Sequence, residues 1–212
     1  MNNKQAILVW DVPTRVFHWL LVISFAGAWL TSESERLQMI HYAFGYSAVA
    51  LVLFRLVWGL IGTKYARFTQ FIKGPKQILS HLKDALGGHQ HATVGHNPAG
   101  GVVMVALMLI ILLIGLTGYL SVKEFLGDFM SEAHEAIASL ALALVIVHIA
   151  AAVIMSLLQK ENLVRAMVNG KKQGLPEQAI RFPQYLIGIL LVLGWIYLFY
   201  MVVSGSLPAL TQ

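Results

Sequence analysis

Apolar stretches alternate with polar connections along the chain, and five of the apolar stretches are predicted to be membrane-spanning helices. They cover residues 16–30, 39–61, 99–120, 131–158 and 183–203. A helix needs about 20 mostly apolar residues to cross the hydrocarbon core of a bilayer. A short amphipathic helix is also predicted at 75–86, inside the long polar connection 62–98. The pattern therefore predicts an all-α integral membrane bundle that ends in a fifth, C-terminal transmembrane helix.

The composition agrees with a membrane protein and excludes several kinds of metal site. The chain has 212 residues, of which 58% are hydrophobic and only 12% are charged. It contains no cysteine. Disulfides, cysteine-ligated iron–sulfur clusters, covalent c-type haem attachment and thiolate ligation of haem are therefore excluded. Histidine is the expected ligand for any metal.

The charged residues predict the orientation of the chain in the membrane. The connections at 62–98 and 159–182 are net positive, whereas those at 31–38 and 121–131 are net negative. Positively charged loops stay on the cytoplasmic side of a membrane. The N-terminus is therefore predicted to be cytoplasmic and, after five spans, the C-terminus periplasmic. The net charge of +5 follows from this topology signal, and nucleic acid is not a predicted partner.

Four histidines in the apolar stretches fall into two pairs by depth. His134 and His148 are fourteen residues apart, which is about 21 Å along a helix and within about 40° of the same face. The predicted topology places His41 level with His134 near the periplasmic edge, and His18 level with His148 near the cytoplasmic edge. We call these the outer pair and the inner pair.

Packing explains a single intramembrane histidine more easily than two level pairs, because buried polar side chains are costly in a bilayer. A structural zinc ion would need four ligands at one point, which the separation of about 21 Å forbids. The simplest use of each pair is bis-imidazole ligation of a haem iron, with one ligand from each side of the porphyrin. The sequence therefore predicts two haem groups, one at each pair.

Three further residues are candidates for contact with such a group. Arg55 lies fourteen residues after His41, so it shares that face at the depth of the inner pair. It could bind a haem propionate, or extend its charge towards the interface. Gly45, one turn after His41, would let a flat macrocycle approach, although glycines also serve plain helix packing. Arg15 could contact an inner propionate or act as a positive anchor.

Several motifs resemble the bacterial cytochrome b561 family, which includes the b-type cytochrome subunits of nickel–iron hydrogenases. They are VWDVPTRVFHW, IHYAFGY with a later FRLVWG, GHNPAGG, and the HE…H pattern of the fourth span. The resemblance covers roughly residues 8–170. It implies a four-helix cytochrome of the bacterial inner membrane that holds b haems non-covalently. By motif, it makes axial ligands of the following residues: His18, His41, His134 and His148.

The resemblance also implies electron transfer between the quinone pool of a respiratory chain and a redox partner. A quinone site is expected near the inner pair, around Arg15, His96 and Lys160. His96 could instead form a hydrogen bond with a haem propionate, or simply cap the start of the third span. The partner could be a c-type cytochrome, a hydrogenase or another dehydrogenase. The remaining histidines of the 62–98 connection fit solvated loop residues better than a metal site: His81, His89 and His91.

These observations predict three parts and one leading function. Residues 1–158 form the haem-binding membrane domain, 159–182 a cytoplasmic connection, and 183–212 the fifth helix and tail. The chain is predicted to be an electron-transfer subunit, because no nucleophile or acid–base pair lies within the spans. One alternative is a superoxide:quinone oxidoreductase of the same fold. Such an enzyme would need a positively charged outer surface to attract its anionic substrate, and the net acidic outer connections count against it. A non-redox membrane subunit would leave the paired histidines unexplained.

Overall fold

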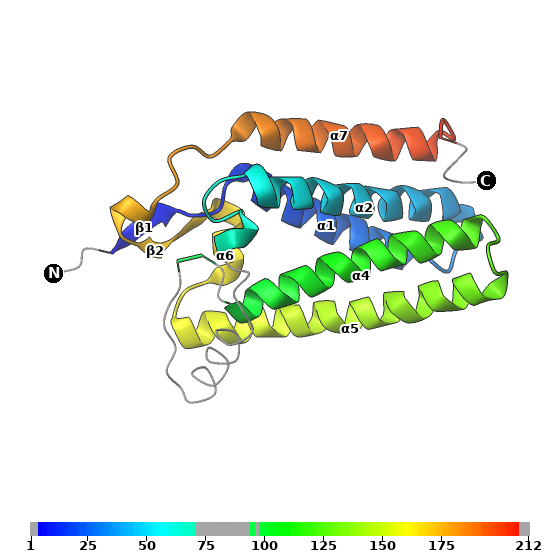
Figure 1. The fold of residues 1–212 in the computed structure, drawn as a ribbon, viewed down its shortest axis with the longest axis horizontal. Coiled ribbons are helices and arrows are strands. Elements are labelled where there is room, and N and C mark those ends of the chain that lie inside the picture. Colours follow the sequence, from blue (N-terminus) through cyan, green and yellow to red (C-terminus); the bar gives the residue numbers. More distant parts are fainter. Residues whose placement is uncertain (1–3, 71–93, 96–97, 208–212) are drawn as a thin grey trace.

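The structure is a computed structural model that describes residues 4–70, 94–95 and 98–207. The described part is dominated by long helices that run side by side (Figure 1). They are α1 (Val12–Thr31), α2 (Gln38–Ile61), α4 (Pro98–Val122), α5 (Asp128–Gln159) and α7 (Tyr185–Val203). They overlap the five predicted apolar stretches. The predicted amphipathic helix at 75–86 lies outside the described residues.

Four of these helices are long and apolar enough to cross a membrane: α2 with the short 3-10 turn η1 (Glu35–Leu37) before it, α4, α5 and α7. The remaining long helix, α1, has 20 residues and carries Arg15 and His18. It packs against both α2 and α7. It therefore runs alongside the apolar helices as part of the bundle (Figure 1).

The helices form two antiparallel pairs, α1 with α2 and α4 with α5, which are joined through contacts between α2 and α4. Helix α7 contacts α1 and α2 and lies on the side of them that faces away from α4 and α5 (Figure 1). A core of Ala48, Val52, Met108 and Ile111 fills the space between α2 and α4. The arrangement leaves α7 outside the group formed by the other four helices.

Helix α1 begins at Val12, four residues earlier than the apolar pattern predicts. The Asp11 carboxylate explains the early start, because its Oδ1 accepts a hydrogen bond from the backbone N–H of Thr14 at 2.8 Å. Such a bond satisfies one of the free N–H groups in the first turn. Pro13 also suits that turn, since a helix start needs no N–H from it.

The prediction of an all-α fold is confirmed, and the described chain adds one small antiparallel sheet that was not predicted. Strand β1 (Gln5–Leu8) pairs with β2 (Lys171–Gly174). The backbone N–H groups of Val9 and Trp10 both donate to the Gly170 carbonyl, at 2.8 and 3.0 Å. The N-terminal segment is thereby fixed to the connection between α5 and α7. Each strand has four residues, too few to give a periodic signal in the sequence.

The connection between α5 and α7 is more structured than the sequence suggests. It contains the helix α6 (Leu163–Asn169), strand β2 and the 3-10 turn η3 (Pro176–Gln178), and another such turn, η2 (Phe68–Gln70), follows α2. Apolar side chains from the N-terminal segment, from the segment after α2 and from this connection form a second core: Ile7, Val9, Trp10, Tyr65, Ala166 and Ile180. A small folded cap therefore covers one end of the helices.

The two ends of the bundle differ in charge. We call the end that carries β1, β2 and α6 the basic end (Figure 1). Its described cationic residues include Arg15, Lys64, Arg67, Arg165, Lys171 and Lys172. The opposite end, where α1 meets α2 and α4 meets α5, is the acidic end. Its carboxylates include Glu33, Glu35, Glu124 and Asp128. This difference matches the charge pattern of the connections.

Candidate functional site

The structure brings the two histidines of the outer pair together near the acidic end. The ring centroids of His41 on α2 and His134 on α5 are 6.1 Å apart, and the ring planes are inclined by 78°. The Nδ1 atom of His41 lies 2.9 Å from the Ala28 carbonyl oxygen, and that of His134 lies 3.0 Å from the Ile114 carbonyl oxygen. Since a carbonyl only accepts, each Nδ1 carries the proton. Each Nε2 is then left with a lone pair.

This arrangement fits a metal ion held between the two rings. Imidazole nitrogens bind first-row metal ions at about 2.0–2.1 Å, and a ring centroid lies roughly 1.1 Å behind the bonded nitrogen. Two imidazoles on opposite sides of one ion therefore have centroids about 6 Å apart. Metal-ligating histidines also donate their other N–H to a carbonyl or carboxylate, which fixes the ring. Both observations hold for His41 and His134.

The carbonyl that orients His41 is available because α1 ends nearby. In a continuing helix the N–H of Ser32 would bond to the Ala28 oxygen, but it donates to Trp29 instead, at 3.4 Å. The last carbonyls of a helix have no partner within it. The end of α1 thus supplies the acceptor for a ring on α2.

The ring of His134 lies against Gly118 of α4, a residue that sequence reasoning missed. A Cβ atom added at Gly118 would lie 2.9 Å from Cε1 and 3.0 Å from Nδ1 of that ring. The absence of a side chain lets the imidazole reach the Ile114 carbonyl. The neighbouring Thr117 hydroxyl also lies 3.4 Å from His134 Nδ1. The signal in the sequence was a glycine within a leucine-rich span, where glycine usually weakens a helix.

The inner pair is also brought together, towards the basic end. His18 of α1 and His148 of α5 are close enough for an electrostatic interaction between the rings. The His18 ring meets that of Trp19 edge-on, with centroids 5.1 Å apart. Its Nδ1 atom is buried and has no hydrogen-bond partner among the described residues. The inner histidine on α1 therefore lacks the carbonyl contact that orients both outer rings.

Arg55 is buried, with only 1% of its surface exposed, so its charge does not extend to the interface. Its Nη2 donates to the Ala66 carbonyl at 2.9 Å, and the guanidinium lies over the Phe68 ring at 5.2 Å. The buried Asp11 carboxylate attracts it electrostatically. Its Nη1 is buried without a partner in the described chain. A donor of Arg55 is thus left for an anion.

The other candidates are placed as follows. A Cβ at Gly45 would meet nothing within 4 Å, so open space lies beside α2 one turn after His41. Arg15 Nη1 donates to the Val168 carbonyl at 2.6 Å and holds the end of α6 against α1. The predicted quinone contact His96, with His81, His89 and His91, lies outside the described residues.

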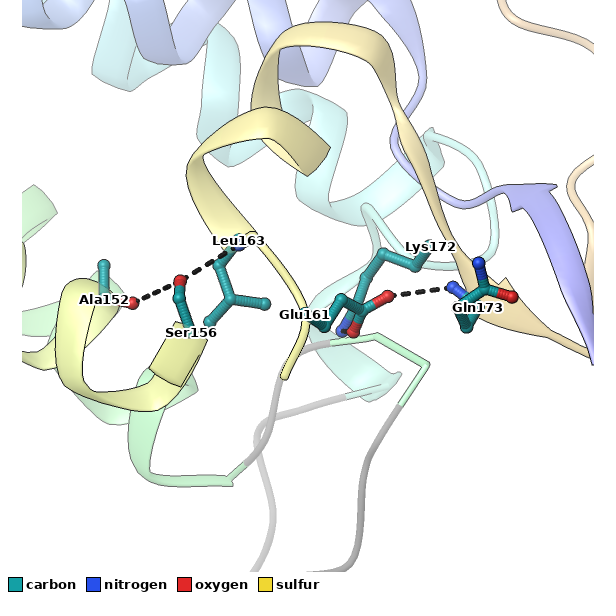
Figure 2. A network of polar contacts seen from close by, with 6 residues as sticks. All are labelled: Ala152, Ser156, Glu161, Leu163, Lys172 and Gln173. Carbon is teal, nitrogen blue, oxygen red and sulfur yellow. Dashed lines mark hydrogen bonds and ion pairs between the residues drawn. The ribbon is translucent and has the colours of Figure 1, made fainter. Parts of the chain in front are cut away.

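Lys160 is exposed at the end of α5, where it has a positive φ of 51°. It lines a cavity of about 450 Å³ together with Ser156, Glu161 and Asn162. Figure 2 shows how this region is fixed: Ser156 accepts from the Leu163 N–H at 3.0 Å, and Glu161 accepts from the Gln173 N–H at 2.8 Å. These bonds join the end of α5 to α6 and β2.

Within residues 4–70, 94–95 and 98–207, no three histidine or carboxylate side chains converge on one point as a metal site. The fold therefore defines a helical protein with four apolar helices long enough to span a membrane, in which His41 and His134 lie side by side. A family model, prokaryotic cytochrome b561, matches residues 9–170. The chain belongs to this prokaryotic family of membrane cytochromes.

Two relatives illustrate the similarity. The probable Ni/Fe-hydrogenase 1 B-type cytochrome subunit of Escherichia coli K12 is 23% identical over 150 residues, which cover 58% of this chain and 63% of the relative. The probable Ni/Fe-hydrogenase B-type cytochrome subunit of Rhizobium leguminosarum bv. viciae is 22% identical over 215 residues, covering 80% of this chain and 90% of the relative. The match thus spans less than two thirds of the Escherichia coli protein. No solved structure matches the chain significantly.

Proposed function

We propose that the chain is a di-haem b-type cytochrome that carries electrons across the bacterial inner membrane, between the quinone pool and a redox partner. The observation that carries the proposal is the outer pair, in which two imidazoles with free Nε2 atoms have centroids 6.1 Å apart. The family supports haem b as the group between them.

Each part of the site has a defined task in this proposal. His41 and His134 would hold the outer haem, and His18 and His148 would hold the inner haem. The unpartnered Nη1 of Arg55 would be available to a propionate of the inner haem, and Gly45 would leave room for a macrocycle next to α2. A bound haem supplies one-electron redox chemistry, whose potential the protein adjusts through ligands, hydrogen bonds and burial.

The orientation follows from the charge difference between the two ends. We place the basic end in the cytoplasm, with five crossing helices that include α1, so the C-terminus is periplasmic. The division into three parts, 1–158, 159–182 and 183–212, remains part of the proposal. The contacts of α7 with α1 and α2 add it to the outside of the proposed four-helix haem domain.

A quinone would bind at the cytoplasmic side, where Arg15, His96 and Lys160 were predicted to contact it. The cavity beside Lys160 supports this choice, because both apolar and polar groups line it at the end of a spanning helix. The redox partner is proposed to be a hydrogenase, since both relatives are described as hydrogenase cytochrome subunits. A c-type cytochrome or another dehydrogenase is the alternative.

The test combines a haem count with a reduction assay on the purified protein. A pyridine haemochrome assay is expected to give two b haems per chain, and a soluble quinol should reduce them in detergent. Purified protein that contains no haem would contradict the proposal, and the four histidines would then be explained by helix packing. Protein with two haems that no quinol reduces would retain the cytochrome and contradict the quinone reaction.

Gly118→Ala is expected to weaken haem binding at the outer pair. The new methyl would meet the His134 ring at 2.9–3.0 Å, and displacing it should break the bond to Ile114. Loss of such a contact behind a metal ligand typically costs 10–100-fold in affinity. Haem retention during dilution into haem-free detergent measures the effect. Gly194→Ala is the control, because a Cβ there meets nothing within 4 Å; equal retention in the two variants would contradict the prediction.

A further inference from the structure

A long cavity lies between α2 and α7, and none of the four paired histidines lines it. Its volume is about 370 Å³. One wall is formed by residues of α2 between Ser47 and Phe54, and the other by residues of α7 between Ile187 and Leu198. From Ile187 to Leu198 the wall is about 16 Å long, at ~1.5 Å per helical residue. We call this space the α2–α7 groove.

Helix α7 is held close to its neighbours near both ends of the groove. Near the basic end, Gly188 lies so close to α1 that an added Cβ atom would overlap the Val12 side chain. Towards the acidic end, the ring of Phe199 meets that of Phe44 on α2, with centroids 4.8 Å apart. Between these contacts the side chains of α2 and α7 leave the groove unfilled. The packing of α7 on the bundle is therefore incomplete without an occupant.

The lining of the groove fits a hydrocarbon chain better than water. Ser47 supplies a single hydroxyl, which is buried and has no hydrogen-bond partner in the described chain. A buried water typically makes about three hydrogen bonds, which one hydroxyl cannot provide. Gly194 is exposed, and a Cβ atom there would meet nothing within 4 Å. The groove therefore opens beside α7 to the surrounding bilayer, which supplies acyl chains.

The groove approaches the basic end, where exposed cations follow α2 and precede α7. Lys64 comes just after α2, and Arg181 just before α7, and both side chains are exposed. The Nζ atom of Lys64 lies over the Tyr65 ring at 5.2 Å, and the Tyr65 hydroxyl donates to the Gln178 carbonyl. Lys64 is thereby placed beside the connection that leads to Arg181 and α7. Cations at the edge of a membrane attract anionic lipid headgroups.

We propose that the α2–α7 groove binds one acyl chain of an anionic phospholipid, whose phosphate is held by Lys64 and Arg181 in the leaflet at the basic end. The chain fills the space that α7 leaves against α2, and the lipid thereby joins the fifth long helix to the other four. This site goes beyond the proposed electron transfer, and it depends neither on the number of haems nor on the redox partner.

The test is native mass spectrometry of the full chain, stripped of lipid and titrated with phosphatidylglycerol or phosphatidylcholine in detergent micelles. One phosphatidylglycerol per chain is expected to bind about tenfold more tightly than phosphatidylcholine. Gly194→Leu should weaken this binding about tenfold, because the new side chain takes the place of the acyl chain. The matched control is Ala143→Leu, at an exposed position of α5 that does not line the groove. Equal binding by the two variants would overturn the site.

Two further variants separate the headgroup from the chain. Changing Lys64→Gln together with Arg181→Gln should abolish the preference for phosphatidylglycerol and retain one bound lipid; an unchanged preference would overturn the headgroup assignment. Ser47→Ala should bind phosphatidylglycerol as the unmodified protein does, because an acyl chain needs no donor at this depth. Loss of binding in Ser47→Ala, or displacement of the lipid by a soluble quinone, would assign the groove to a carbonyl-bearing ligand instead.

A fluorescence measurement tests the groove without filling it. Trp195 lines the groove, so phosphatidylglycerol with brominated acyl chains should quench its emission, which is obtained as the difference between the unmodified protein and Trp195→Phe. An excess of unbrominated phosphatidylglycerol should reverse the quenching, whereas the same excess of phosphatidylcholine should leave most of it in place. Reversal by both lipids alike would show only the exchanging lipid that surrounds any membrane protein, and would overturn the proposal.

Discussion

His134→Ala is expected to reduce the haem content from two per chain to about one. The variant removes one of the two imidazoles of the outer pair, whose Nδ1 atoms are already engaged by Ala28 and Ile114. His41 alone cannot provide the second axial bond, and no other described histidine or carboxylate converges there. The inner pair is unchanged, so one haem should remain. His148→Ala should give the same count through loss of the inner haem.

The pyridine haemochrome assay with a protein determination gives the count. Leu140→Ala on the same helix is the control, because this leucine is 56% exposed and lies away from both histidines along α5. It should keep two haems. Retention of both haems by His134→Ala would show that the outer pair does not ligate iron. Loss of both haems by each histidine variant would point to a single shared site instead of two.

Asp11→Ala should destabilise the protein more than any other single change outside the histidines. Its Oδ1 caps α1 through Thr14, and its Oδ2 accepts from Trp58 Nε1 at 3.1 Å and from Thr63 Oγ1 at 2.6 Å. The loss of a helix cap costs about 1 kcal/mol. Each buried donor left unsatisfied costs roughly 1–3 kcal/mol more. The total is about 3 kcal/mol or above.

Thermal unfolding in detergent, followed by circular dichroism, measures this effect as a fall of the midpoint by several degrees. Asp11→Asn keeps one amide oxygen as an acceptor and should recover part of the loss. Asp128→Ala is the control, because this exposed aspartate lies in the first turn of α5. If Asp11→Ala and Asp128→Ala unfold at the same temperature, the Asp11 contacts do not hold the ends of α1 and α2 together.

The long helices could be predicted from the sequence because their signal is local. Each apolar stretch predicts its own helix, and the spacing of His134 and His148 already places them on one face. The start of α1 was missed because its first turn contains Thr14 and Arg15, and hydropathy does not count such polar residues as part of a spanning helix. An Asp followed by Pro in the first turn is a signal for the start of a helix, and this signal has to be looked for separately from hydropathy.

The support around the histidines could not be predicted, because it comes from backbone groups distant in the sequence. The oxygen that fixes His41 belongs to Ala28, and the one that fixes His134 belongs to Ile114. Any residue has a carbonyl group, so only the packing of α2 on α1 and of α5 on α4 selects these two. The strands β1 and β2 were missed for a similar reason, since their partners are more than 160 residues apart.

The pairing of β1 with β2 has a consequence for the order in which the molecule is completed. Chains fold as they emerge from the ribosome, beginning with the N-terminal part. Residues 5–8 emerge before all of the long helices, yet their partners at 171–174 are synthesised only after α1, α2, α4 and α5. The N-terminal strand must therefore wait for most of biogenesis before it can pair. The N–H of Val12 then bonds to the Pro183 carbonyl, so the same event positions the chain for α7. Formation of the sheet is therefore a late step, which follows synthesis of the four preceding helices.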